Sequence, residues 1–161
     1  MARTVSALTI AITLAAGAAA VADEAGNVKA LGSAWNRVKR LNTASAQAMP
    51  EANYAFKPTP DVRSFGQILG HLANEHFMIC SEVKGEPNPQ KAVDFEKKAT
   101  KADLVRALTD SYAYCEGVTP KDDKGFASLL GNVTHDSEHY GNLVTYMRMK
   151  GIVPPSSQPS R

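Results

Sequence analysis

The sequence lacks a dense cluster of basic residues and any strong excess of one charge. Lysine and arginine total 18 against 16 acidic residues, and they are scattered along the chain. The most densely charged segment, residues 94–103, mixes both signs, as solvated segments do. Proteins that bind nucleic acids present basic patches, so we expect no nucleic-acid partner.

A long apolar run is also missing. The apolar stretch from Ala7 to about Ala20 is shorter than the roughly 20 residues that a membrane-spanning helix needs. It follows a single arginine and ends in Ala20-Val21-Ala22, a small-x-small cleavage site, so it is typical of an export signal. We expect residues 1–22 to be a signal peptide and residues 23–161 to form one exported domain, periplasmic or secreted, with no membrane segment in its mature form. A retained membrane anchor is the alternative.

The sequence shows no sustained alternation of apolar and polar residues, which a half-buried strand would need. Apolar residues instead recur at helical spacing in four segments separated by proline and glycine, so the predicted fold class is all-α. Ser64 followed by Gln67 is a capping-box pattern. The expected helices run from about Val28 to Met49, from Ser64 to Gly85, from Thr100 to about Val118, and from Asp122 or Asp123 to Gly151.

Cysteine is scarce: the sequence contains two, Cys80 and Cys115. In an exported protein they predict a disulfide, and two buried thiols are the alternative. Each lies about 15 residues, or roughly 23 Å, past the start of its predicted helix, while bridged Cα atoms lie within about 7 Å. A disulfide would therefore make the second and third helices parallel. The result is an up-down-down-up four-helix bundle with a long crossover between helices 2 and 3.

Histidine supplies the strongest functional signal. His135 and His139 are four residues apart, so on a helix both can point at one ion, and His71 would join them from the second helix. Three imidazoles with an open fourth position suit an exchangeable or catalytic divalent metal. Imidazole binds zinc, nickel, copper or iron, so the pattern does not choose the metal. The alternative is that the polar faces carrying these histidines face solvent.

Other polar residues near these positions are weaker candidates. Glu75 lies one turn after His71, and Asp136 and Glu138 lie beside the histidine pair, between its two members, so each is a candidate to orient a ligand. A plain surface role is the alternative for these acids. Tyr140 could donate a hydrogen bond to a ligand on the metal, or pack in the core. His76 falls on the apolar face and is interpreted as a core histidine.

With these residues in place, the chain resembles the DinB-like family of small four-helix-bundle proteins, in particular its exported bacterial members. The resemblance lies in the blocks AMPEANYAFKPTPDVRSFGQILGHLANEHFMICSEVKGE, SYAYCEGVTP and HDSEHYGNLVTYMRMKGIVPPSS, in that order and spacing. It implies an up-down-down-up bundle, often dimeric, that binds a divalent metal through one histidine on the second helix and H-x-x-x-H on the fourth. Those positions correspond to His71, His135 and His139.

The resemblance also implies a range of activities. Some relatives resemble metal-dependent thiol transferases or thiol-dependent isomerases, and others resemble hydrolases of unassigned substrate. The transferases act in the cytoplasm with their thiol cofactors, so the predicted export of this chain argues against thiol transfer.

We expect a metal-dependent hydrolase or transferase with an unknown small-molecule substrate, zinc or nickel as the ion, and Glu75 and Tyr140 as catalytic candidates. The alternatives are a non-catalytic bundle that binds a metal or small ligand, or is stress-related, and a bundle whose metal site has decayed. A homodimer is compatible with each.

Overall fold

The computed structural model describes the backbone of residues 5–159 and the side chains of residues 25–159. The predicted signal peptide, residues 1–22, lies outside the part whose side chains are described. Within the described residues, no helix combines the length and the apolar character that crossing a membrane requires.

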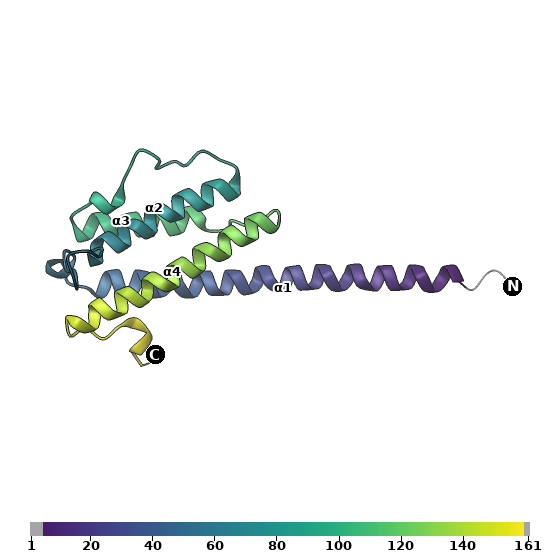
Figure 1. Cartoon of the computed structure of the whole chain (residues 1–161), viewed down its shortest axis with the longest axis horizontal. Helices are drawn as coiled ribbons and strands as arrows, with labels where there is room; N and C mark the ends of the chain where they lie inside the picture. The colour runs from purple at the N-terminus through teal and green to yellow at the C-terminus, as the bar shows by residue number, and fades with distance from the viewer. Residues whose placement is uncertain (1–4, 160–161) are drawn as a thin grey trace.

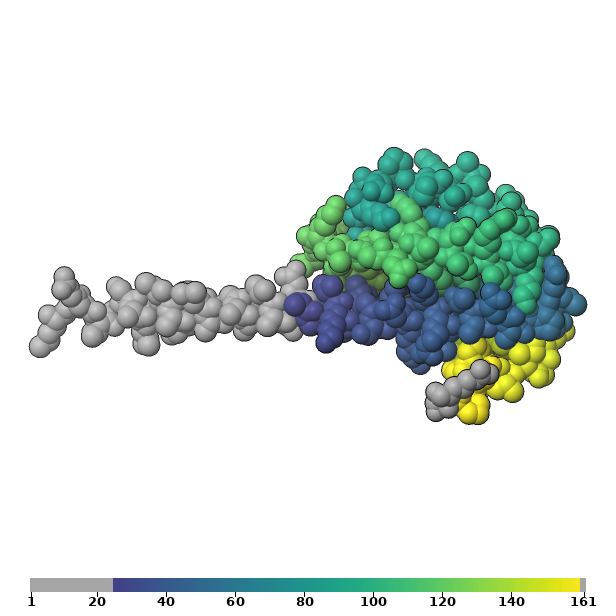
Figure 2. Space-filling model, turned by 180° about the vertical axis from the view of Figure 1, so that it is seen from behind, coloured from purple at the N-terminus to yellow at the C-terminus, as the bar shows by residue number. Residues whose placement is uncertain are grey.

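The described chain is all-α, as predicted, and it forms a four-helix bundle without strands (Figure 1). Short 3₁₀ helices occur in the links and near the C-terminus. In Figure 2 the C-terminal residues lie on the side of α1 opposite to α2 and α3. The elements are α1 (Val5–Ala48), η1 (Glu51–Asn53), α2 (Phe65–Lys84), η2 (Phe95–Lys97), α3 (Lys101–Cys115), α4 (Asp123–Met149) and η3 (Pro155–Ser157).

Local capping explains where α2 begins and ends. Ser64 accepts a hydrogen bond from the backbone N–H of Gln67, and the Gln67 side chain accepts one from the Ser64 N–H, which confirms the predicted capping box. Gly85 ends the helix with a φ of 76°, a left-handed conformation that glycine adopts without steric cost.

Two predicted boundaries were wrong. The first helix starts at Val5 rather than near Val28, because the alanine-rich segment before Val28 has high helix propensity and no proline interrupts it. The third helix ends at Cys115 rather than near Val118, since Gly117 adopts a φ of 73° and turns the chain away.

The helices run up, down, down and up, as predicted. α2 and α3 are parallel, because the Leu104 side chain packs against Gly66 near their starts and Cys80 is bonded to Cys115 near their ends. The Cα atoms of this confirmed disulfide are 5.5 Å apart. Leu31 of α1 clusters with Cys80 near the end of α2, while Ala46 near the end of α1 clusters with Phe65 at the start of α2. The first helix, α1, therefore runs antiparallel to α2. The long link between α2 and α3 then returns along the bundle.

Apolar side chains fill the bundle in two clusters, one at each end. The larger includes Leu69, Leu108 and Met147, and the smaller surrounds the disulfide with Leu31 and Val133. Burying each such side chain stabilises the fold by roughly 1.5–3 kcal/mol, before the cost of conformational entropy.

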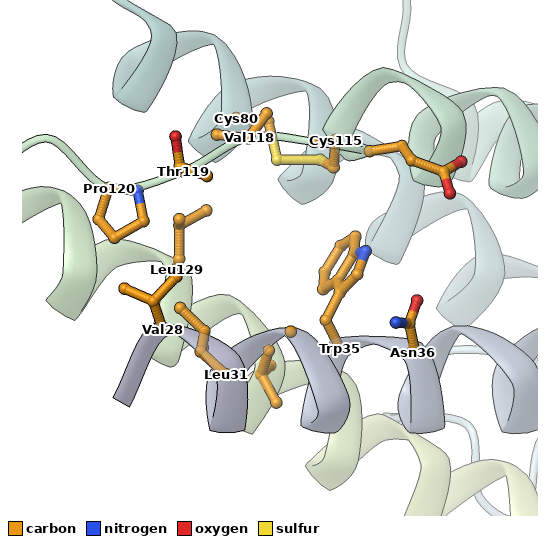
Figure 3. Close-up of a pocket in the computed structure, with 14 residues that line it drawn as sticks. Val28, Leu31, Trp35, Asn36, Cys80, Cys115, Val118, Thr119, Pro120 and Leu129 are labelled. Carbon is orange, nitrogen blue, oxygen red and sulfur yellow. A yellow bond between two sulfur atoms is a disulfide. The ribbon is translucent and has the colours of Figure 1, made fainter. Parts of the chain in front are cut away.

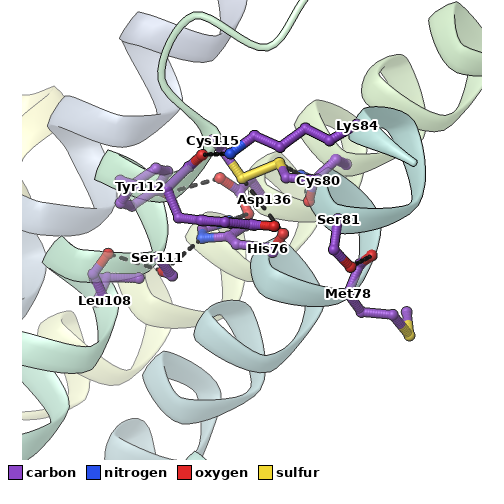
Figure 4. The surroundings of a disulfide bond; sticks show 12 residues. His76, Met78, Cys80, Ser81, Lys84, Leu108, Ser111, Tyr112, Cys115 and Asp136 are labelled. Atoms are coloured by element: carbon purple, nitrogen blue, oxygen red, sulfur yellow. Dashed lines mark hydrogen bonds and ion pairs between the residues drawn. A yellow bond between two sulfur atoms is a disulfide. The ribbon is translucent and has the colours of Figure 1, made fainter. Parts of the chain in front are cut away.

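A buried polar network lies beside the disulfide (Figure 4). The Ser111 hydroxyl donates to the Leu108 carbonyl, so Nδ1 of His76 donates to Ser111 Oγ at 2.9 Å. Nε2 of His76 lies 2.9 Å from Oδ1 of Asp136, whose Oδ2 accepts from the Tyr112 hydroxyl at 2.7 Å. His76 is fully buried, which confirms the prediction that it is a core residue.

The crossover between α2 and α3 is held closely against α2. A Cβ atom on Gly70 would lie 2.4 Å from the carbonyl oxygen of Phe95, so only glycine permits this approach. The Asn74 side chain accepts from the Phe95 N–H at 3.1 Å and donates to Asp94 at 3.2 Å. These contacts fix η2, and with it Glu96, above α2.

Candidate metal centre

The structure brings the three predicted imidazoles together from two helices. His71 projects from α2, and His135 and His139 project from successive turns of α4. Nε2 of His71 lies 3.0 Å from Nε2 of His135, and one nitrogen from each of the three rings lies within 4.8 Å of the others. All three are partly exposed, so the cluster can be reached from solvent.

Glu96 completes the cluster and was missed in the sequence analysis. Nδ1 of His71 donates to Oε1 of Glu96 at 3.0 Å, and Oε2 of Glu96 accepts from Nε of Arg63 at 3.0 Å. With its proton on Nδ1, His71 presents a lone pair at Nε2. A carboxylate that fixes the orientation of an imidazole in this way is the usual support of a metal-binding histidine.

The sequence contained only an indirect signal for Glu96. It lies in a mixed-charge link without helical periodicity, which reads as a solvated segment. Gly70 and Asn74, both on α2, bring that link to the cluster, and neither identifies its neighbour from sequence alone.

The surroundings of His135 and His139 favour their neutral forms. Burial, followed by the nearby charges of His135, His71 and Arg63, lowers the pKa of His139 to about 4. Burial, followed by the charge of His71, also lowers the pKa of His135. Neutral rings carry the lone pairs that a metal requires.

The donor set and the spacing fit a divalent cation. Metal–nitrogen bonds of about 2.0–2.1 Å in a tetrahedral site place ligand nitrogens roughly 3.3 Å apart, close to the observed 3.0 Å between His71 and His135. Nδ1 of His135 is buried and has no hydrogen-bond partner among the described residues. This nitrogen is not the one that faces His71, which is Nε2, so Nε2 is the atom of His135 that would hold an ion shared with His71.

The other predicted site residues lie in different surroundings. Glu75 lies close enough for its negative charge to raise the pKa of His135, against the effect of burial. The Tyr140 hydroxyl accepts from the Ser156 N–H at 2.9 Å, which ties it to the C-terminal segment. Asp136 is buried in the network described above rather than bonded to a cluster histidine, and Glu138 is exposed.

A cavity of about 580 Å³ opens beside His139. Its volume is in the range typical of small-molecule sites. Apolar groups from the link before α2 form part of the wall. Its polar lining includes Lys57, Arg63, Gln67, Glu96 and Asn142.

Comparison with known protein families gives a match that covers most of the bundle. The model of the DinB superfamily matches residues 34–142, a segment that contains the cluster and most of the four helices. No curated protein matches the chain.

Proposed function

The chain belongs to the DinB superfamily, and from this membership and the histidine cluster we propose that it is a metal-dependent enzyme of the hydrolase or transferase type. His71, His135 and His139 would hold the ion, and zinc or nickel suits three imidazoles. The observation that carries the proposal is that one ring nitrogen from each of the three histidines lies within 4.8 Å of the others.

A divalent ion held by these histidines would supply a Lewis acid, able to activate a water or a thiol as a nucleophile near neutral pH. The protein supplies orientation and a place for substrate. Glu96 holds the His71 ring in one tautomer, and Arg63 in turn holds Glu96. The cavity beside His139 offers a polar surface for the substrate next to the cluster.

Two residues remain candidates for moving a proton. Glu75 is the stronger, because its negative charge is within electrostatic range of His135. Tyr140 is the weaker, because its hydroxyl already accepts a hydrogen bond from the C-terminal segment.

We also propose that the protein works outside the cytoplasm. The disulfide between Cys80 and Cys115 is consistent with an oxidising compartment. The apolar N-terminal segment, ending in a small-x-small site, is consistent with export. A hydrolytic reaction fits such a compartment better than transfer from a cytoplasmic thiol cofactor.

The test is a panel of ester, amide and thiol-adduct substrates assayed with zinc-loaded, nickel-loaded and chelator-treated protein. We expect turnover that chelation abolishes and metal restores. Glu75→Gln should lower kcat by about 10² or more, whereas Tyr140→Phe should leave it within about twofold. Metal retained tightly with no turnover on any substrate would contradict the enzyme and favour a non-catalytic metal-binding bundle.

A further inference from the structure

A second cavity, remote from the histidine cluster, lies at the disulfide end of the bundle. Its volume is about 280 Å³, and Figure 3 shows it between α1, the loop that follows α3, and α4. Trp35 rises into it from α1, Leu129 projects from α4, and the Cys80–Cys115 disulfide forms the opposite wall.

The inside of this cavity is apolar. Its lining includes Val28, Leu31, Val118 and Val133, together with Pro120. Such a surface gains free energy when it contacts an apolar molecule instead of water. No basic side chain is among the described residues that line it, so nothing there favours an anion.

The polar lining residues are few. They include Asn36, Thr119 and Glu116, and Glu116 forms an ion pair with Lys39 at 3.2 Å. The described chain also exposes five large apolar side chains, and none of them lines this cavity. They are Val62, Met78, Leu130, Met149 and Val153. A docked protein would bury about 800 Å² of surface per partner, much more than this cavity offers, so the cavity suits a small molecule.

Glycine keeps the cavity open. Gly32 lies within α1, where glycine lowers helix stability by about 1 kcal/mol relative to alanine. No close packing requires it, because a Cβ atom there would meet nothing within 4 Å. Since both Gly32 and Gly117 line the cavity, larger side chains at these positions would project into the space or its mouth.

We propose that this cavity binds one small, uncharged and mostly apolar molecule, whose single hydrogen-bonding group pairs with one of the two uncharged polar side chains of the lining, Asn36 or Thr119. Apolar protein cavities of about 150 Å³ hold benzene, so a cavity of about 280 Å³ accommodates roughly ten heavy atoms. The site is independent of the metal centre, because no cluster histidine lines it.

The chain offers its own reporter, since Trp35 is the only tryptophan and lines the cavity. We would titrate the purified protein with 1-octanol and follow tryptophan emission. The proposal expects a saturable change, the same with and without zinc. Adding a second hydroxyl, in 1,8-octanediol, should weaken binding about tenfold or more, because that hydroxyl loses its water inside the cavity.

Gly32→Leu fills the cavity and should abolish the saturable change, and Gly32→Ala should weaken it. Gly26→Leu is the matched control. Gly26 is also on α1, and a Cβ atom added there would meet nothing within 4 Å, but Gly26 does not line the cavity. Helix content measured by circular dichroism checks that each variant folds. A linear, non-saturating response, equal binding by Gly32→Leu, or an emission change that follows protein concentration through self-association would overturn the proposal.

Discussion

Replacing Glu96 by glutamine tests the support that the crossover gives to the histidine cluster. The carboxylate accepts the Nδ1 proton of His71 at 3.0 Å and pairs with Arg63 at 3.0 Å. The amide of glutamine removes the charge that makes His71 a better ligand and no longer fixes its tautomer. Losing such support usually weakens metal binding 10- to 100-fold, or about 1.4–2.7 kcal/mol.

The same change should have little effect on folding. Glu96 is 24% exposed and Arg63 is 44% exposed, and a pair this close to solvent contributes about 0–1 kcal/mol. Glu96→Gln should therefore lower metal affinity without a comparable loss of stability in the metal-free protein. This separates a role at the metal centre from a structural one.

The assay is isothermal titration with zinc at fixed pH, alongside chemical unfolding of the metal-free protein. Glu138→Gln is the matched control, since Glu138 is an exposed acid on the helix that carries His135 and His139. Its affinity should equal that of the wild type. If Glu96→Gln binds zinc as tightly as Glu138→Gln, the argument that Glu96 orients His71 is wrong.

Three further predictions, the first with a control variant, test the packing that places the cluster. Gly70→Ala should destabilise the protein by about 1–3 kcal/mol in urea unfolding, because its Cβ would meet the backbone of η2 at 2.4 Å, whereas Gly131→Ala, with free space around it, should be neutral or stabilising. Replacing Cys80 and Cys115 by alanine should cost about 4 kcal/mol by the chain-entropy estimate for a separation of 35 residues, and unfolding with and without reductant measures it. Asp136→Ala should cost about 3–5 kcal/mol, since it leaves its fully buried histidine partner without a carboxylate; a loss below 1 kcal/mol in the same assay would contradict this account of the network.

Sequence reasoning succeeded where local chemistry determines the structure. Ser64 and Gln67 cap a helix through groups three residues apart, so their spacing alone predicts the start of α2. His135 and His139 share a face because the helix repeats every 3.6 residues. The disulfide gave a long-range constraint, and it correctly predicted that α2 and α3 are parallel.

The features of the site that the sequence did not predict depend on contacts between segments far apart in the sequence. Glu96 reaches His71 only because Gly70 lets the crossover approach α2, and no periodic pattern marks that pair. Asp136 is next to a cluster histidine in sequence but points into the core, where it meets His76. Neighbouring positions on a helix point in different directions, so proximity in sequence did not give proximity at the site.

The most direct test of the metal centre is the location of the ion itself. Crystals of zinc-loaded protein measured at the zinc absorption edge should show one anomalous peak per chain, within about 2.3 Å of a ring nitrogen from each of His71, His135 and His139. The variant in which all three are alanine should lose the peak and its bound zinc while it keeps its helical fold. No peak between these rings in zinc-loaded wild-type crystals, or zinc bound equally by the triple variant, would contradict the account.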